Sequence, residues 1–583
     1  MNDQSKTPLL SRATREHQAA FWACLLALAL SSPAARPQTA PNKASPGPEA
    51  VAAPRSQLTL PAAQGVTAPD GAQDIKFELG DIVIDGGFPG LEARSAALVS
   101  TLKGRTISVA DLYTFAGGLQ QAYFEAGYPL ARVVIPPQSL AADGRVRVLV
   151  VDGYIEAIDT SSLAPKVRSR IDRMLQDLVG QRQPTRAILE RRLLLAGDTA
   201  GLVLRSTITP GTTVGGTVLV LTGKHDALST ALSVDNRVDE SLGRSQLTAS
   251  LSANSPFGGG GRAVATVAGH PGLDMLSESS LRRYLSLRAE TPIGKEGLMT
   301  GLRADYSSTR PGGAVAAQEL FSEYSRVGAT LSYPLVRSRS ANLLMTASFD
   351  AARDIQQTAL AGPPDTPLSL DRTRVIRLGL EGDARSGRGA ELRYGVLASF
   401  GVDALGARSA DDATDLLPLS RQGADASFRS LEATVAVAAS APLGTTVGAT
   451  LRGATGFGRP LLRSEQFSPG GRDGLSGPPP GLLVGDRGLV GRLELSRPVV
   501  RDGDFVVAPY IFGTKARVWL EKPTALERGS TDAREYGAGV RLSLGSWEPG
   551  SPRASLAFEV SELSSDDERL DRSWFSGSFT VWY

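Results

Sequence analysis

The sequence predicts an α+β region followed by an all-β domain that crosses a membrane as a barrel. Three observations on the 583 residues lead to this fold class. Residues 77–224 alternate between strand and helix patterns, and one order of elements occurs twice within them. Residues 226–583 lose the helical period and instead alternate apolar and polar residues in many short segments. An export signal precedes both regions.

The N-terminus has the pattern of a secretory signal peptide, predicted over residues 1–35. Two arginines precede an apolar run from Ala19 to Leu30, and small residues follow it. This run is shorter than the roughly 20 residues that a transmembrane helix needs. A buried helix of a soluble protein is the alternative. The single cysteine, Cys24, lies inside the run, so the mature chain would contain none. Residues 36–74 follow as a linker rich in proline and alanine.

The α+β region divides into two units with the same order, β-α-α-β-β. The predicted elements of the first unit are 81–85, 92–102, a helix capped by Ser108, 131–135 and 145–151. Those of the second unit are 155–158, 167–178, 185–195, 201–208 and 217–221. We therefore expect two related domains, at 75–152 and 153–225. Two unrelated α/β domains are the alternative.

The remaining residues, 226–583, are assigned to the barrel. Clear alternation occurs at Tyr284–Glu290, Gly491–Ser496, Tyr536–Leu544 and Leu556–Ser561. A soluble β-sandwich has the same period, so the length of the region, the export signal and the terminal strand decide between the two. That strand carries Phe579, Val581 and Tyr583 on one face, as expected of a lipid-facing strand and of a C-terminal barrel signal.

The composition argues against several classes of function. A net charge of +2 disfavours a nucleic-acid-binding protein, and three histidines with one cysteine leave little material for a metal site. The glycine-rich stretch Gly258–Gly261 lacks the lysine and hydroxyl residue of a phosphate-binding loop. The stretch Gly474–Pro478 fails as a serine-hydrolase elbow at its last position, and no histidine follows His270. We expect no cofactor, no nucleic-acid partner and no enzyme.

Several weak motifs occur in one particular order along the chain. In the first α+β unit they comprise Gly127, Tyr128, Gln138, Asp143, Gly144 and Gly153. In the barrel region they include Asn254–Gly258, Pro292–Gly294 and Tyr333–Leu335 at hairpin positions, and Glu465–Gly471 before a long loop. With these motifs, residues 75–583 resemble the TpsB transporters of two-partner (type Vb) secretion, the FhaC-ShlB-type haemolysin activators of the POTRA-barrel superfamily.

The resemblance implies two periplasmic POTRA domains and an outer-membrane barrel of about 16 antiparallel strands in a Gram-negative bacterium. It also implies a function: the POTRA domains capture an unfolded partner exoprotein, and the barrel secretes it to the cell surface. Further implied partners are outer-membrane lipid, lipopolysaccharide and the barrel-assembly machinery that inserts the chain. The alternative is an outer-membrane protein insertase of the same superfamily, which normally carries more POTRA repeats.

The chain departs from the family at the sixth extracellular loop. Members usually carry Val-Arg-Gly-aromatic at the tip of this inward-folded loop, and its arginine pairs with an aspartate of a Phe-x-Asp-x-Gly strand motif. The aligned loop residues here are Gly470, Gly471, Arg472, Asp473, Leu475, Ser476, Gly477 and Pro478, and the strand residues are Phe512, Thr514 and Ala516. Serine thus replaces the arginine and threonine the aspartate. We expect the loop to be either looser or held by other residues, with Arg472, Asp473 and Pro478–Pro480 as candidates, unless the alignment is displaced by a few residues.

Overall fold

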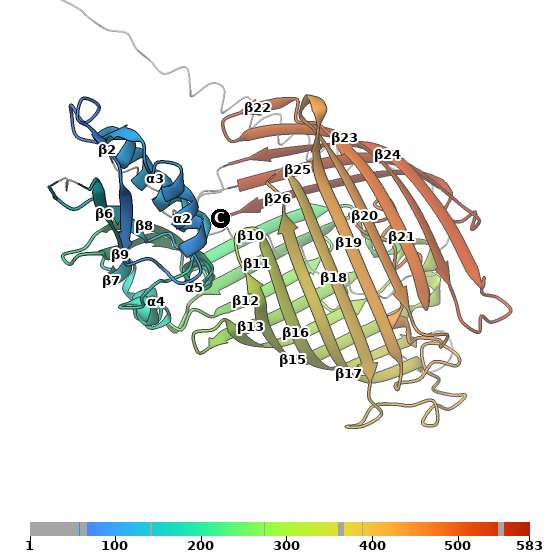
Figure 1. Ribbon diagram of the computed structural model, residues 1–583. Helices are drawn as coiled ribbons and strands as arrows, with labels where there is room; N and C mark the ends of the chain where they lie inside the picture. Colours follow the sequence, from blue (N-terminus) through green and yellow to red (C-terminus); the bar gives the residue numbers. More distant parts are fainter. Residues whose placement is uncertain are drawn as a thin grey trace, which may run out of the picture.

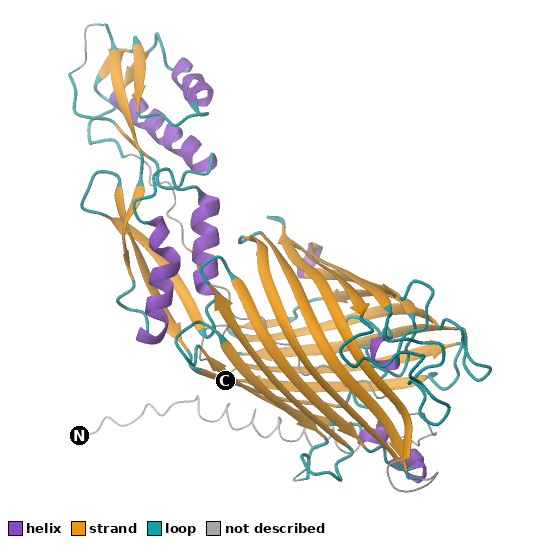
Figure 2. Ribbon diagram, turned by 90° about the horizontal axis from the view of Figure 1, so that it is seen from below, coloured by secondary structure: helices purple, strands orange, loops and turns teal. Residues whose placement is uncertain are grey.

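Two consecutive α/β domains project from one end of a closed β-barrel in the computed structural model (Figures 1 and 2). The structure describes residues 57–58, 67–139, 143–272, 274–359, 366–387, 389–545 and 553–583. The predicted signal peptide and most of the predicted linker lie outside the described residues. Among those residues, the helices are all too short or too polar to cross a membrane.

The first domain places two helices on a small sheet. Its elements are β2 (Lys76–Glu78), β3 (Asp81–Asp85), α2 (Glu92–Ser100), β4 (Thr106–Ser108), α3 (Val109–Glu125), β5 (Arg132–Val134) and β6 (Arg145–Val151). The sheet has the order β3-β6-β5, and β2 pairs with β4 beside it. Ser108 caps α3 as predicted, since its hydroxyl accepts the Asp111 N–H at 3.1 Å. The apolar faces of α3 and the sheet meet in a core that includes Leu119, Tyr123 and Val148.

The second domain repeats this order of elements. It consists of β7 (Tyr154–Asp159), α4 (Pro165–Leu175), the short helix η1 (Gln176–Leu178), α5 (Arg186–Gly197), β8 (Leu202–Pro210) and β9 (Gly216–His225). A two-residue strand, β1 (Gln57–Leu58), pairs with β8 in parallel, so the sheet order is β1-β8-β9-β7. Hydrogen bonds lower the pKa of the Glu156 carboxyl to about 2; the largest contribution comes from the Thr212 side chain and the next from Thr213. The turn between β8 and β9 therefore stays bonded to β7 at neutral pH.

The second domain is docked on the adjacent mouth of the barrel. Arg192 of α5 forms an ion pair of 2.8 Å with Glu296, which lies in the turn after β13. Arg337, at the end of β15, forms another of 2.6 Å with Asp198. These two ion pairs fix the second domain to the sector of the mouth formed by the ends of β13–β15.

The barrel closes on itself through antiparallel pairing. Its strands are β10 (Leu228–Asp235), β11 (Gln246–Asn254), β12 (Arg262–Gly269), β13 (Arg282–Ile293), β14 (Leu298–Thr309), β15 (Leu320–Arg337), β16 (Ala341–Thr358), β17 (Thr366–Arg385), β18 (Ala390–Gly401), β19 (Arg429–Ala441), β20 (Thr445–Thr455), β21 (Arg487–Ser496), β22 (Val500–Asp502), β23 (Phe505–Trp519), β24 (Ser530–Leu544), β25 (Arg553–Ser565) and β26 (Arg572–Trp582). Both β21 and β22 pair with β23 and form two parts of one wall strand. The described residues therefore build the predicted barrel of 16 strands.

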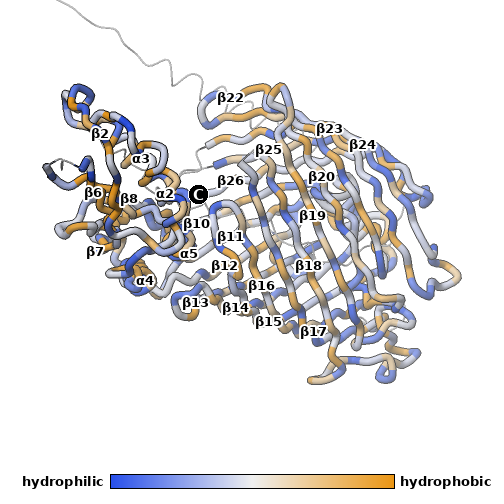
Figure 3. Tube along the Cα trace, viewed as in Figure 1, coloured by the Kyte–Doolittle hydropathy of each residue, from blue (hydrophilic) through white to orange (hydrophobic). Residues whose placement is uncertain are grey.

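Hydrophobic and hydrophilic residues alternate along the barrel strands, as the sequence pattern predicts (Figure 3). On β17, Ile376, Leu378 and Leu380 point outward and are exposed, as lipid-facing side chains are. Arg377, between them, points inward and bonds Asp350 of β16. The interior is thus a polar lumen lined with charged side chains.

The terminal strand β26 closes the barrel against β10. Five residue pairs form this seam, from Ala231–Trp582 to Asp235–Ser578. The Tyr583 N–H and C=O extend it through two hydrogen bonds with Thr230, at 3.0 and 2.9 Å. The side chain of Ser576 points inward, since it bonds the Ser476 carbonyl, and Thr580 lies on the same face, where it bonds the Ser233 hydroxyl. Phe579, Val581 and Tyr583 alternate with these residues and therefore lie on the outward face.

Candidate functional site

The connection between β20 and β21, residues 456–486, folds back into the lumen. In chain order it is the sixth connection at the end remote from the two α/β domains. Phe467 and Gly485 pair as a narrow ladder at its base, with N···O distances of 2.8 and 2.9 Å. Phe467 and Leu475 are buried with Val490 and Val518 of the wall. We call this segment loop 456–486.

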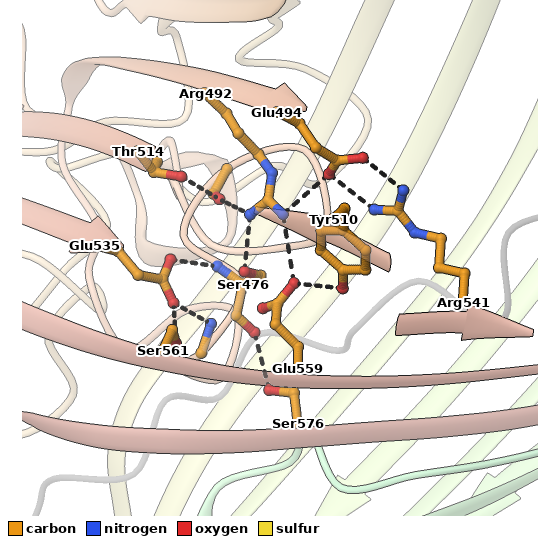
Figure 4. Close-up of polar contacts among 12 residues, drawn as sticks. Ser476, Arg492, Glu494, Tyr510, Thr514, Glu535, Arg541, Glu559, Ser561 and Ser576 are labelled. Atoms are coloured by element: carbon orange, nitrogen blue, oxygen red, sulfur yellow. Dashed lines mark hydrogen bonds and ion pairs between the residues drawn. The ribbon is translucent and has the colours of Figure 1, made fainter. Parts of the chain in front are cut away.

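The tip of loop 456–486 is bound by the wall strands that follow it (Figure 4). The carboxylate of Glu535, on β24, accepts the Ser476 N–H at 2.8 Å and the Gly477 N–H at 2.7 Å. The Ser561 hydroxyl donates to the same carboxylate at 2.6 Å. A Cβ on Gly477 would lie 2.7 Å from both Glu535 Oε1 and Trp574 Cβ, so this approach requires glycine. A hydroxyl of β26, on Ser576, donates to the Ser476 carbonyl at 3.3 Å.

Arg492 of β21 binds the tip from the other side. Its Nη1 donates to the Ser476 hydroxyl at 2.9 Å and to the Gly474 carbonyl at 3.3 Å. Its Nη2 lies 3.2 Å from Glu494 and 3.3 Å from Glu559, and the guanidinium stacks on the Phe512 ring at 3.6 Å. Arg492, Glu535 and Glu559 are all at most 4% exposed. The planar guanidinium therefore binds the loop through Nη1 and the wall carboxylates through Nη2.

Two further arginines bind the loop closer to its base. Arg377 of β17 makes a bidentate ion pair with Glu465, at 2.8 and 3.0 Å. Arg452 of β20 donates to the Ser468 carbonyl at 3.4 Å. Because β17 lies across the barrel from β26, the contact with Arg377 means that the loop spans the lumen, whereas Arg452 binds it beside its own base.

At the remote rim, the buried carboxylate of Asp486 connects three loops. It accepts the Leu461 N–H at 2.9 Å within loop 456–486 and the Glu521 N–H at 2.7 Å from the next loop. Arg421, from the preceding loop, lies 3.3 Å from it. The base of loop 456–486 is therefore fixed together with its two neighbours.

The residues that sequence alignment placed at the tip do lie there, but they do not contact each other as a pair. The Thr514 hydroxyl donates to the Gly474 carbonyl at 3.2 Å, and the Ser476 hydroxyl accepts from Arg492. Phe512 and Ala516 flank Thr514 on the lumenal face of β23, Phe512 beneath Arg492 and Ala516 in the apolar cluster with Phe467. Thr514 thus binds the loop backbone at Gly474, two residues before Ser476.

The candidates Arg472 and Asp473 do not hold the loop to the wall. They lie in the tight turn that Gly470 and Gly471 begin, where the Gly471 N–H donates to the Leu475 carbonyl at 2.9 Å. Both side chains are exposed and, within the described part of the chain, form no hydrogen bond or ion pair. Pro479 and Pro480 pack against Gly470 within the loop and stiffen it.

Sequence reasoning missed Arg492, Glu535 and Glu559, which bind the tip or its arginine. Each lies on an alternating strand whose inward face carries charge, which is the signal available in the sequence. The strand order β21-β23-β24-β25 brings the three side chains to one part of the lumen, and nothing local distinguishes them from other lumenal charges.

The motif residues of the first domain have structural roles. A Cβ on Gly153 would lie 1.9 Å from the Leu130 carbonyl oxygen. Gln138 bonds the Arg147 N–H and C=O at 2.8 Å each, and Tyr128 packs edge-on to Phe88 with ring centroids 5.0 Å apart. Asp143 and Gly144 form the turn before β6, where the Asp143 carboxylate accepts the Arg145 N–H at 3.1 Å. In the described part of the chain, no group of three or more potential metal ligands occurs.

Comparison with known proteins agrees with this architecture. Residues 77–153 match the ShlB-type POTRA domain, and residues 215–520 match the family described as haemolysin secretion/activation protein ShlB/FhaC/HecB. The heme/hemopexin transporter protein HuxB of Haemophilus influenzae strain 86-028NP is 24% identical over 307 residues, which cover 51% of this chain and 52% of HuxB. The chain thus matches about half the length of these curated relatives.

Two solved structures share the fold over nearly the whole chain. CdiB from Escherichia coli superposes with a TM-score of 0.66 at 17% identity, covering 90% of this chain and 93% of CdiB. CdiB from Acinetobacter baumannii gives a TM-score of 0.55 at 14% identity, covering 100% and 99%. The barrel lies in the outer membrane of a Gram-negative bacterium with its POTRA domains in the periplasm. Since the family match extends over more than half of its residues, the chain belongs to the ShlB/FhaC/HecB family, in agreement with the resemblance to TpsB transporters.

Proposed function

We propose that this chain captures an unfolded partner exoprotein through its POTRA domains and secretes it through the barrel to the cell surface. The observation that carries the proposal is the attachment of loop 456–486. Its tip occupies a polar lumen and is held by hydrogen bonds and ion pairs. Each of these bonds involves a charged group, and such a bond contributes about 1.5–3 kcal/mol. The loop is thus held by a small number of separate non-covalent contacts, and we expect it to leave the lumen when the exoprotein replaces them.

The β-sheet edges of the periplasmic arm support the capture step. Strand β8 already pairs with an extended segment, β1, and strands β3 and β5 form the two edges of the first domain's sheet. An unfolded chain can add a strand to such an edge through main-chain hydrogen bonds, which do not depend on its sequence. The docking of the second domain on the barrel mouth would then deliver that strand to the pore. Folding of the exported protein outside the cell would supply the direction.

The experiment that tests this function is a comparison of exported proteins. The gene would be deleted in its parent bacterium, and proteins of the medium and cell surface would be quantified by mass spectrometry. We expect one polypeptide to disappear from both fractions and to return when the full chain is restored. A general loss of barrel proteins from the outer membrane, with the medium unchanged, would instead identify an insertase.

Capture and passage should be separable by deleting the first POTRA domain. A chain without residues 75–152 keeps the contacts that dock the second domain, including Arg192–Glu296 and Asp198–Arg337. We expect it to insert as a heat-modifiable barrel and to export less than about a tenth of the normal amount, since strand addition at that domain's edges is lost. Export at the full level would assign capture to the second domain.

A further inference from the structure

The outward face of β13–β17 carries an apolar groove with a volume of about 490 Å³. The pairing register aligns one row of outward residues across these five strands: Leu287, Ala304, Val327, Ala351 and Arg374. The small side chains of Ala304 and Ala351 lie between larger ones and form its floor. Leu287 and Val327 are 62% and 58% exposed, as expected for side chains that face lipid.

A second outward row lies two residues closer to the remote rim. It consists of Leu285, Tyr306, Ser325, Arg353 and Arg372. Arg372 and Arg374 lie on the part of β17 that extends past the end of β18, since Val375 pairs with Gly401, the last residue of that strand. Arg374 also donates to the Leu405 carbonyl, in a remote loop, at 3.0 Å. The groove is thus apolar on β13–β15 and basic at its end on β16 and β17.

The basic end of this groove carries excess positive charge. Arg353 and Arg372 are paired directly across β16 and β17, an arrangement in which like charges repel. Arg353 has one carboxylate partner, Glu323, at 3.2 Å. Among the described residues, Arg372 and Arg374 have no carboxylate partner, and Arg374 donates only to backbone carbonyls. An anion between these guanidinium groups would relieve the repulsion.

We propose that this groove binds the lipid A part of lipopolysaccharide. The outer leaflet of this membrane offers an amphiphile with several acyl chains below a phosphorylated sugar. An acyl chain would lie along the Leu287 row, and a phosphate would bind between Arg372 and Arg374. Guanidinium groups bind phosphate oxygens through paired, charge-assisted hydrogen bonds. The proposed site lies on the outer surface of the wall, at β13–β17, so lipid binding there does not depend on the passage of an exoprotein.

The test compares two double variants with equal loss of charge. Arg372→Gln with Arg374→Gln removes the basic end of the groove. Lys515→Gln with Arg534→Gln is the matched control, because Lys515 and Arg534 are likewise two neighbouring outward cations near the same rim, paired across β23 and β24. Each full-length protein would be purified in detergent and titrated with bis-phosphorylated hexa-acyl lipid A, and bound lipid would be counted by native mass spectrometry.

We expect the groove variant to bind lipid A at least about tenfold more weakly, a factor that corresponds to about 1.4 kcal/mol, and the control to change by less than about twofold. Ala304→Trp fills the groove without changing charge and should also weaken binding. Heat-modifiability on gels would verify that every variant is folded. Equal losses in both double variants, or equal affinity of the unaltered protein for phosphatidylglycerol, would show a general basic belt and overturn the proposal.

Discussion

Replacing Arg492 with methionine should open the pore. The substitution removes the hydrogen bonds to Ser476 and Gly474 and leaves Glu559 and Glu494 without this cation. Only the two hydrogen bonds to the loop differ between the bound and the released loop, and a hydrogen bond to a charged group contributes about 1.5–3 kcal/mol. A loss of about 3 kcal/mol raises the population with a released loop by roughly two orders of magnitude. Single-channel recording in planar bilayers should show a larger and more frequently open conductance.

Two control variants separate the loop contacts from the charge of the lumen. Arg541→Met removes a neighbouring lumenal arginine that bonds Glu494 and stacks on Tyr510 at 3.9 Å. None of its described contacts reaches loop 456–486, so we expect nearly normal conductance. Arg492→Lys keeps the charge but loses the two-edged geometry, and should be intermediate. If Arg541→Met opened the pore as far as Arg492→Met, the charge network, and not the tip contacts, would control the loop.

Deleting Phe579–Tyr583 should prevent barrel assembly. The deletion removes four of the five residue pairs of the β10–β26 seam, leaving only Asp235–Ser578, and also removes the two Tyr583–Thr230 hydrogen bonds. The exposed edge of β10 would then leave several backbone groups unpaired in lipid, at several kcal/mol each. We expect no heat-modifiable species in isolated outer membranes.

The matched control keeps the backbone of the seam. Thr580→Ala removes the 2.9 Å contact between the Thr580 and Ser233 hydroxyls but no ladder hydrogen bond. This variant should assemble normally. Normal assembly of the truncated protein would mean that closure does not depend on the terminal strand.

The barrel and the α/β repeat were predictable because each follows a local pattern. Inward and outward residues alternate along every strand, and the order β-α-α-β-β occurs twice. Strand length was not predictable in this way. The strands β15, β16 and β17 have 18, 18 and 20 residues, well beyond the length that crosses a membrane. Their extension depends on pairing with neighbours above the lipid, which no single segment encodes.

The attachment of the loop was predictable only in part. The absence of arginine at Ser476 and of aspartate at Thr514 indicates from the sequence alone that the family's pair is missing. Its replacement distributes the charges differently: the guanidinium of Arg492 is on the wall, and the carboxylate of Glu535 binds the loop backbone. Backbone donors leave no trace in the sequence, so this arrangement emerges only from the strand register.

In the proposed function, loop 456–486 leaves its contacts in the lumen during export. A reducible bifunctional thiol cross-linker between Ser476→Cys and Ser576→Cys tests this step, because the two residues are in contact: the Ser576 hydroxyl donates to the Ser476 carbonyl at 3.3 Å. Cys24, the chain's own cysteine, lies in the predicted signal peptide. Export from the parent bacterium would be measured after cross-linking and again after reduction, with each single variant as a control. We predict that the cross-linked protein stops exporting and recovers on reduction. Undiminished export by fully cross-linked protein would contradict the account.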